Sequence, residues 1–380
     1  MRARTVRPLV WLVLAGCGDA TRDTSVNVPA DTTARVTTLG GKLSVPAGFK
    51  VTYYAPNVPG VRFMAIGPDG AVYASQPGRG RIVRLPDANR DGVADTTTVV
   101  VTGLNQPHGL AFHKNALYVA NTDGVVRIGI ANGVATGAPV YVNRYPSGGG
   151  HWTRTIVFGA DDAMYVAVGS SCNLCVEQTT ERAAVLRFNE DGTSKRVYSS
   201  GLRNAVGLAV NPRNGTVWAS QNERDNLPPS HEDLPPEEIN ILVDGADFGW
   251  PYCYADRVPN PEYNDAARCA STVPPALKMQ AHSAPLGMTF LAGASTFPAD
   301  YRSDLLVALH GSWNRDTPTG AKVVRVRVAN ETPVSVEDFI TGWQQANGER
   351  WGRPVDVVVA ADGSVLVSDD GSGAIFRVSR

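Results

Sequence analysis

The chain has 380 residues, and its 35 basic and 36 acidic side chains give a formal net charge of −1 at pH 7. A balance so close to neutral argues against nucleic acid as a partner, because proteins that bind it carry an excess of basic residues. The 38 glycines and 26 prolines indicate many turns, and no stretch after the N-terminal region is long and apolar enough to predict a membrane span.

The first residues are typical of an export signal. A short apolar run, Leu9–Leu14, follows three arginines and leads through Ala-Gly to Cys17; the arginines are Arg2, Arg4 and Arg7. The run is too short to cross ~30 Å of hydrocarbon, which predicts a signal peptide over residues 1–16. Small residues before a cysteine resemble the lipobox of bacterial lipoproteins. We therefore expect Cys17 to be lipidated and to anchor an exported protein to the cell envelope, on its periplasmic or outer-membrane face. An ordinary signal peptide with a coincidental cysteine is the alternative.

Residues 17–38 hold few large apolar side chains and predict a flexible tether. The rest of the chain, residues 39–380, is expected to form one domain, since all-β domains reach this size. The membrane contact would then be limited to the lipid anchor.

A phrase of two short strands around a turn recurs six times in this domain. The copies are MAIGPDGAVYAS (64–75), LAFHKNALYVA (110–120), IVFGADDAMYVA (156–167), LAVNPRNGTVWAS (208–220), MTFLAGASTFPADYRSDLLVA (288–308) and VVVAADGSVLVS (358–368). Most copies continue into a third strand, and the alternating residues around Asp-Gly turns indicate antiparallel hairpins. Such repeats predict an all-β fold, a six-bladed β-propeller with four-stranded antiparallel blades.

Residues 42–55 precede the first copy, and no copy follows the sixth. We predict that this segment supplies the outer strand of the last blade and so joins the two ends of the ring. A seventh blade would require a hidden copy in the long interval between the fourth and fifth repeats.

Four cysteines follow Cys17, and an even number in an exported chain predicts two disulfides. Closeness in sequence favours Cys172–Cys175 and Cys253–Cys269, although two other pairings remain open. A zinc site formed by the four cysteines is the rival interpretation.

Residues that depart from the repeat are the candidates for function. In GGGHWTRT (148–155), three glycines allow a close backbone approach, and His151 stands ahead of a strand. Histidine is the natural base for a hydroxyl proton near neutral pH. A histidine that is merely hydrogen-bonded in a loop is the alternative, and His108 holds the matching position one blade earlier.

Arg203 and Asn204 also stand immediately before a strand. The planar guanidinium can bind a carboxylate or a quinone oxygen, and a buried salt bridge between blades is the structural alternative. Further on, HGSWNRDTPTGAKVVR (310–325) and NGERWGRPVDV (347–357) place one tryptophan and three arginines ahead of strands: Trp313, Arg315, Arg350 and Arg353.

Two segments suggest calcium. Residues 222–254 are acidic and proline-rich, and carboxylate and carbonyl oxygens are the ligands that calcium prefers. The loop 87–95 has oxygen-bearing side chains at calcium-loop spacing, without the glutamate that closes an EF-hand loop: Asp87, Asn89, Asp91 and Asp95. A solvated turn explains this loop equally well.

Several of these segments together resemble the sugar dehydrogenases that use pyrroloquinoline quinone (PQQ). The resemblance covers residues 40–380 and rests on GGHWTRTIVF, VGSSCNLC, GLRNAVGLAVNP, PPEEINILVDGADFGWPYC, HGSWNR and GRPVDVVVAADGSVLVSDD. The cysteine-containing motifs favour the sorbosone and pyranose branch over the glucose branch.

The resemblance implies a role for each matching residue. His151 would take the sugar hydroxyl proton, and Arg203 and Asn204 would lie beside the cofactor. The backbone of Asn222, Glu223 and Arg224 would hold Ca²⁺. The cofactor carboxylates would be held by Arg353 first, then by Arg315 and Arg350, with Trp313 nearby. One departure is Gly150, where the glucose branch has an aspartate, so another group must orient His151.

The function implied is hydride transfer from a sugar to bound PQQ, with the electrons then passed to an external acceptor. Two other classes of propeller protein are the alternatives. A calcium-dependent lactone hydrolase would need carboxylates converging on the propeller axis, where this sequence has His and Arg. A non-catalytic binding propeller would not need basic residues at several strand entrances.

Overall fold

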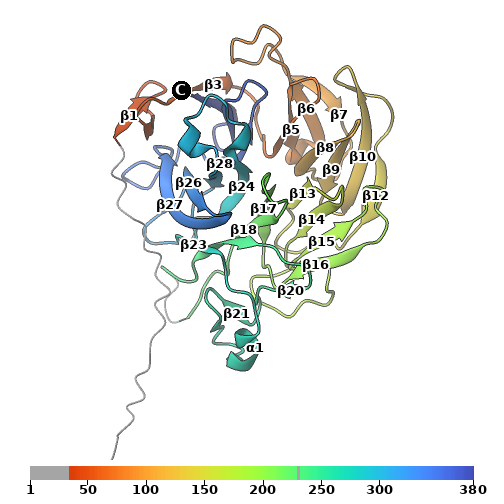
Figure 1. The fold of residues 1–380 in the computed structure, drawn as a ribbon, viewed down its shortest axis with the longest axis vertical. Helices are drawn as coiled ribbons and strands as arrows, with labels where there is room; N and C mark the ends of the chain where they lie inside the picture. Colours follow the sequence, from red (N-terminus) through yellow and green to blue (C-terminus); the bar gives the residue numbers. More distant parts are fainter. Residues whose placement is uncertain (1–33, 229–231) are drawn as a thin grey trace, which may run out of the picture.

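The computed structural model describes residues 34–228 and 232–380, and it consists almost entirely of strands (Figure 1). Six antiparallel sheets are arranged around one axis as the blades of a β-propeller. The first strands of successive blades contact one another in a closed circuit, from β4 through β8, β13, β17, β24 and β28 back to β4. The six-bladed fold predicted from the repeats is therefore confirmed.

The strands of each blade follow in order from the axis outward. Blade 1 holds β4 (Met64–Ile66), β5 (Val72–Gln76), β6 (Arg81–Leu85) and β7 (Thr98–Val101). Blade 2 holds β8 (Gly109–His113), β9 (Ala116–Asn121), β10 (Gly124–Ala131) and β12 (Val140–Arg144), with the short β11 (Val134–Ala135) also on β10. Blade 3 holds β13 (Arg154–Phe158), β14 (Met164–Val168), β15 (Ala184–Phe188) and β16 (Arg196–Ser200).

Blade 4 holds β17 (Ala205–Val210), β18 (Val217–Gln221), β19 (Glu237–Ile241) and β23 (Leu277–Met279). Blade 5 holds β24 (Pro285–Phe290), β25 (Leu305–Leu309), β26 (Lys322–Ala329) and β27 (Thr332–Ile340). Blade 6 holds β28 (Pro354–Val359), β29 (Val365–Asp369), β30 (Ala374–Ser379) and β3 (Lys50–Ala55).

The second strand of every blade is buried at every residue, as in MYVAV of β14 and LLVAL of β25. Both faces of these strands lie against neighbouring sheets, which is why they read as nearly continuous apolar runs of small and β-branched residues. Aromatic side chains on these strands fill the gaps between blades. Tyr73 meets Phe112 of the next blade with ring centroids 4.8 Å apart, and Trp218 meets Phe290 at 5.1 Å.

The ring closes through β3, which pairs antiparallel with β30 from Lys50↔Ser379 to Ala55↔Ile375. The predicted closing strand is thus confirmed for residues 50–55. The earlier part of the predicted segment is different, because β2 (Leu43–Pro46) pairs with β1 (Arg35–Thr38) and bridges to Thr341 beside blade 5.

The hairpin overlaps the end of the tether predicted for residues 17–38. Strand β1 already begins at Arg35, whose guanidinium donates to the carbonyl oxygens of Ser44 (2.8 Å) and Asp338 (3.0 Å). These bonds fasten the end of the predicted tether to blade 5. The predicted signal peptide and Cys17 lie outside the described residues.

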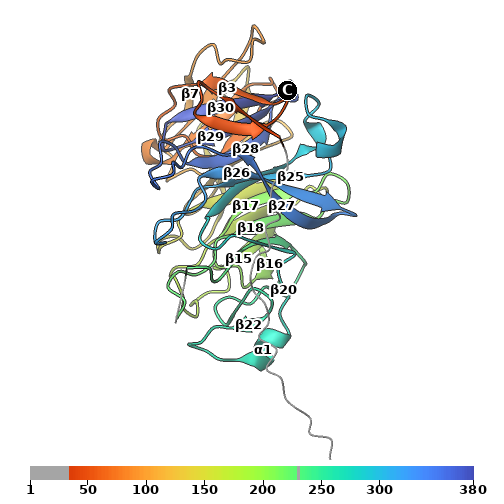
Figure 2. The ribbon, with the colours of Figure 1, turned by 90° about the vertical axis from the view of Figure 1, so that its left-hand side faces the viewer.

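An insertion in blade 4 forms a small lobe that projects from one side of the ring (Figure 2). It contains β21 (Cys253–Tyr254), β22 (Val258–Pro259) and α1 (Ala266–Ala270), while β20 (Ala246–Asp247) pairs with β16 of blade 3. Disulfides join Cys253 to Cys269 in this lobe and Cys172 to Cys175 after β14. The favoured pairing is confirmed, and the zinc alternative for these cysteines is wrong. Within the described residues no helix is long and apolar enough to cross a membrane.

The closing segment generates the first prediction. Phe49 lies directly before β3 and contacts Phe297, Tyr301 and Phe339, with ring centroids 4.8 to 5.2 Å apart. Phe49→Ala should lower the free energy of unfolding by about 3–5 kcal/mol, because it leaves a cavity where the ring closes. Urea denaturation measures the loss. The exposed neighbour supplies the control, since Lys50→Ala should leave the midpoint unchanged; equal midpoints for both variants would contradict the closure account.

Candidate functional site

The basic and aromatic side chains singled out in the sequence gather at one end of the ring. Antiparallel pairing fixes this arrangement, because the start of each first strand lies beside the end of the second strand, as in Arg154↔Val168 and Pro354↔Asp369. Loops that precede first strands and loops that follow second strands therefore share one face. We call this the entrance face; its residues include Arg62, His108, His151, Arg203, Ser170, His310, Arg353 and Asp370.

The glycines before His151 bring its loop against the loop after β14. Gly149 has φ of +82°, and a Cβ added there would lie 2.6 Å from the Cα of Ser171. The N–H of Gly150 donates to the carbonyl of Ser171 at 2.9 Å. The close backbone approach expected from the glycines is therefore present, and it is an approach to Ser171.

The imidazole of His151 is oriented through its Nδ1 atom. Nδ1 lies 3.0 Å from the carbonyl oxygen of Ser170 and 2.8 Å from its hydroxyl. Because a carbonyl only accepts, this contact places the proton on Nδ1 and leaves the lone pair on Nε2. Ser170 is thus the group that orients His151, since the preceding residue, Gly150, has no side chain to do so.

His151 is held in its neutral form. Burial, followed by the positive charge of Arg203, lowers its pKa from 6.5 to about 3. A neutral imidazole with Nε2 unprotonated can accept a proton from a hydroxyl group.

Arg203 and Asn204 lie beside His151. A Cβ added at Gly169 would lie 2.7 Å from both the Oδ1 of Asn204 and the Cβ of His151, so only glycine lets these two residues approach so closely. Arg203 is buried, and its guanidinium donates hydrogen bonds to backbone carbonyls. Nη1 donates to the carbonyl of Glu223 at 2.7 Å, and Nε donates to the carbonyl of Asn173 at 2.9 Å. Its charge therefore supports the floor of the site.

The Cys172–Cys175 disulfide loop carries a residue that the sequence did not single out. The Oδ1 atom of Asn173 accepts from Nη2 of Arg203 and from the N–H of Asp225, both at 2.8 Å. Asp225 in turn accepts from Nδ2 of Asn314 at 3.0 Å. The disulfide therefore lies under a chain of contacts that joins blades 3, 4 and 5.

A second cluster joins blades 5, 6 and 1 across the entrance face. Asp370 forms an ion pair with Arg62 at 2.6 Å and contacts Nε2 of His310 at 2.9 Å. Burial lowers the pKa of His310 to about 4. Burial by itself would raise the pKa of Asp370. The hydrogen bond from His310 helps to outweigh burial, and the pKa is lowered to about 2. Arg353 donates to the carbonyls of His310 (3.0 Å) and Gly311 (2.9 Å), so it lies beside this cluster.

The two clusters meet at Trp152. Its ring lies 5.8 Å from the guanidinium of Arg62 and 5.6 Å from the ring of His108. His108 itself is fully buried, packs against Phe63 with the two rings tilted and their centroids 4.1 Å apart, and contacts the carbonyl of Arg154 through Nδ1. Of the two rival histidines, His151 is the one left partly accessible, while His108 is part of the packed interior.

Relatives of the chain can now be compared with this geometry. Residues 43–380 match the TrAA12-like family. The chain belongs to that family. This agrees with the resemblance to PQQ-dependent sugar dehydrogenases.

Among sequence relatives of this TrAA12-like chain, a PQQ-dependent pyranose dehydrogenase from Coprinopsis cinerea is 27% identical over 407 residues, which covers 89% of this chain but 55% of the length of that protein. An uncharacterized protein from Borreliella burgdorferi is 27% identical over 356 residues, covering 88% of this chain and 90% of that one.

Two solved structures are similar. The holo form of the pyranose dehydrogenase PQQ domain from C. cinerea superposes with a TM-score of 0.75 at 25% identity, covering 91% of this chain and all of that domain. A calcium structure of a Trichoderma reesei enzyme of family AA12 has a TM-score of 0.79 at 21% identity, covering 94% of this chain and 99% of that one, and shows the shared fold.

Three of the residues predicted to bind the cofactor either bond to other parts of the protein or face solvent. Arg350 is used within the protein, with Nε and Nη2 to Gln344 and further bonds to Ser312 and Thr319. Arg315 forms ion pairs with Glu232 at 3.4 Å and Asp233 at 3.1 Å, in the blade 4 insertion. The side chain of Trp313 is 76% exposed. Arg353 is the predicted arginine that lies closest to the second cluster.

The calcium candidates differ in their contacts. The carbonyls of Asn222 and Glu223 accept from Nη1 of Arg203 at 3.1 and 2.7 Å, so both point toward the floor of the site. The guanidinium of Arg224 turns away to Glu262 at 2.8 Å. Behind them, burial raises the pKa of Glu237 to about 8, while its carboxyl accepts from the N–H of Glu223 at 2.7 Å.

The loop 87–95 uses its side chains on its own backbone. Asp87 accepts from the N–H groups of Asp91 (3.1 Å) and Gly92 (2.9 Å), and Asp95 accepts from that of Ala88 at 2.6 Å. In the part of the chain that the structure describes, the three acidic side chains of this loop do not bring their oxygens within 4.8 Å of one another. The loop is therefore a turn whose own side chains accept hydrogen bonds from its backbone N–H groups.

The depressed pKa of His151 generates a prediction on stability. Between pH 6.5 and 3 the unfolded chain binds a proton that the folded protein does not, so this group makes stability fall as the pH drops. One pKa unit corresponds to about 1.4 kcal/mol, so wild type should lose about 2 kcal/mol more than His151→Asn between pH 6.5 and 5. Urea denaturation at a series of pH values measures both proteins. Parallel pH profiles would show that His151 is not buried in its neutral form.

Proposed function

We propose that this protein is a quinoprotein sugar dehydrogenase that oxidises a sugar with PQQ as its cofactor and Ca²⁺ as its metal ion. The observation that carries the proposal is the placement of His151, with Nδ1 fixed by Ser170 and Nε2 unprotonated, beside Arg203 and Asn204. The pyranose dehydrogenase of C. cinerea, which is named for its PQQ dependence, supports the choice of cofactor.

The entrance face fits a polyanionic cofactor. PQQ carries three carboxylates, and Arg62, Arg203 and Arg353 supply positive charge from blades 1, 4 and 6. In the described residues, Nε of Arg62 and Oδ1 of Asn314 are buried polar atoms with no hydrogen-bond partner. These two atoms therefore keep hydrogen-bonding capacity that a polar ligand could use. Arg62 and Arg353 would hold carboxylates, and Asn204 would lie beside the ring system.

The residues of the protein prepare one proton transfer. When bound, PQQ would supply a two-electron acceptor for the hydride that leaves the sugar carbon. Nε2 of His151 would take the hydroxyl proton of that carbon, and the Ser170 carbonyl would stabilise the imidazolium through Nδ1–H. The neutral state of His151 before reaction makes Nε2 available for this step.

Calcium would bind on the carbonyl side of Asn222 and Glu223. A carbonyl oxygen has two lone pairs, so the bonds from Arg203 leave one on each for a cation. The buried carboxyl of Glu237 behind them supplies compensating negative charge when it ionises. A structure of the T. reesei relative described as its calcium form supports the choice of metal.

Reconstitution tests the proposal. Protein prepared without cofactor should bind PQQ when Ca²⁺ is added and then reduce a dye with at least one sugar of a panel. His151→Ala should keep PQQ affinity near wild type and lower turnover by about 10²–10⁴-fold, because it removes a general base. His108→Asn is the matched control and should keep most activity, since Nδ2 of asparagine can replace Nδ1 of the buried ring. Loss of activity in the control alone would reverse the assignment.

Arg353 should act on binding instead of turnover. A charge-assisted hydrogen bond is worth about 1.5–3 kcal/mol, so Arg353→Ala should weaken PQQ binding by roughly tenfold to a hundredfold with a smaller change in turnover at saturation. Fluorescence titration with PQQ measures the affinity. Unchanged affinity would remove Arg353 from the cofactor site, and a wild-type protein that binds no PQQ at any calcium concentration would reject the dehydrogenase itself.

We also propose that the protein is exported, anchored by lipid on Cys17, and passes electrons to an external acceptor such as a quinone or a redox protein. The lipobox-like sequence before Cys17 supports the anchor. Growth with a labelled fatty acid should label the wild-type chain and leave Cys17→Ala unlabelled and released from membranes. Equal labelling of both chains would disprove the anchor.

A further inference from the structure

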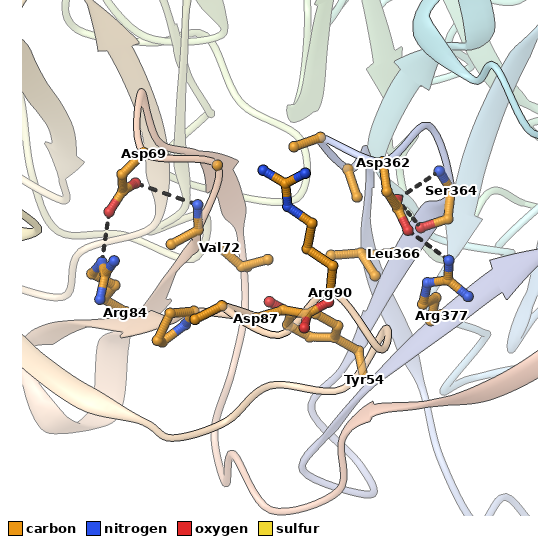
Figure 3. A pocket seen from close by; sticks show the side chains of 16 residues that line it. Tyr54, Asp69, Val72, Arg84, Asp87, Arg90, Asp362, Ser364, Leu366 and Arg377 are labelled. Carbon is orange, nitrogen blue, oxygen red and sulfur yellow. Dashed lines mark hydrogen bonds and ion pairs between the residues drawn. The ribbon is translucent and has the colours of Figure 1, made fainter.

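A cavity of about 410 Å³ lies between blades 6 and 1, away from the entrance face (Figure 3). Its walls come from the β4–β5 turn at Asp69, the β28–β29 turn at Asp362 and the loop that contains Arg90. These turns connect the far ends of the strands, so the cavity opens at the end of the ring opposite to His151. Its volume lies in the range of small-molecule sites.

The cavity exists because blade 6 lacks a side chain that other blades have. In blade 1 the ring of Tyr73 covers Gly67 so closely that a Cβ there would lie 2.4 Å from it, and in blade 3 Tyr165 covers Gly159 at 2.8 Å. The equivalent of both glycines in blade 6 is Ala360, whose N–H makes the same turn bond, to Ser364 at 2.8 Å.

The matching strand position of blade 6 is Leu366, which is shorter than the tyrosines. It belongs to the apolar cluster against which Ile66 of blade 1 packs, whereas the boundary between blades 1 and 2 has the aromatic Phe112 at the position of Ile66. The paired change, from glycine with tyrosine to alanine with leucine, therefore leaves space at the boundary between the last and first blades.

The cavity contains one cation that forms no ion pair in the described residues, Arg90. Arg90 has φ of +59°, an uncommon conformation for a residue with a side chain, and its guanidinium extends between the two walls in Figure 3. Within residues 34–228 and 232–380 it has no hydrogen-bond or ion-pair partner. Its loop is fixed nearby, because the N–H of Ala94 donates to the carbonyl of Tyr54 at 2.8 Å.

Two ion pairs also line the cavity, together with the carboxylate of Asp87, which accepts from the backbone N–H groups of Asp91 and Gly92. Arg84 donates to Asp69 at 2.7 Å on one wall, and Arg377 donates to Asp362 at 2.5 Å on the other. Each pair offers a carboxylate and a guanidinium side by side, which suits hydroxyl groups that both donate and accept. Val72 and Leu366, which are almost fully buried, form the floor between the two pairs.

We propose that this cavity is a second, non-catalytic carbohydrate site that binds an acidic sugar residue of the uronic acid class. The carboxylate would bind Arg90, the hydroxyls would bind the two Asp–Arg pairs, and the ring would lie in the space between the two walls. The proposal does not depend on the chemistry of the entrance face.

Calorimetry on the full mature chain without PQQ tests this site. The probes are methyl α-D-galacturonoside and the neutral methyl α-D-galactoside. Wild type should bind the uronoside more tightly, and Arg90→Ala should weaken that binding at least about tenfold, while Arg90→Lys keeps part of it. Arg127→Ala removes another exposed arginine, on β10, and should leave the affinity unchanged.

The double variant Leu366→Tyr, Ala360→Gly restores the arrangement of blades 1 and 3 and should abolish uronoside binding without lowering the melting temperature. If this variant does not fold, Arg90→Ala decides alone, because its side chain is exposed. A wild type that does not bind the uronoside, or an Arg90→Ala variant with unchanged affinity, would overturn the proposal.

Discussion

The whole molecule depends on the need of each sheet to bury two apolar faces at once. Second strands such as MYVAV of β14 and LLVAL of β25 have no polar face that water could cover, so each blade must lie between two others. A closed ring is the arrangement that gives every blade two neighbours. Its first and last blades obtain this through β3, which carries residues 50–55 to the edge of blade 6.

Ring closure also determines the chemistry, because it brings loops from all six blades onto one face. Arg203 and His151 come from adjacent blades, and Arg62, Asp370 and His310 come from three others. Buried arginines near His151 disfavour its protonation, so the imidazole is neutral before reaction, and the negative charge of a bound polyanionic cofactor would offset these arginines and favour proton uptake. Binding and proton transfer are thus supported by one electrostatic arrangement.

The sequence predicts this fold well because each blade repeats a local pattern, and it predicts His151 because that residue follows an unusual run of glycines. It does not predict Ser170, Asn173 or Asp370, since each is an ordinary loop residue whose partner lies in another part of the chain. Arg315 is the opposite case, a residue that the sequence predicts for the site and the structure places elsewhere. Its type and position suggested a cofactor contact, but acidic residues of the blade 4 insertion hold it, and sequence spacing cannot show such long-range pairing.

The most direct test of the account is a crystal structure of the protein soaked with PQQ and Ca²⁺. The account predicts PQQ on the entrance face, with its carboxylates within hydrogen-bond distance of Arg62 or Arg353, and with its quinone oxygens and the cation beside Asn204 and the Asn222 carbonyl. Nε2 of His151 should face the open side of the cofactor. PQQ bound elsewhere, or a His151 whose Nε2 is covered by protein, would contradict it.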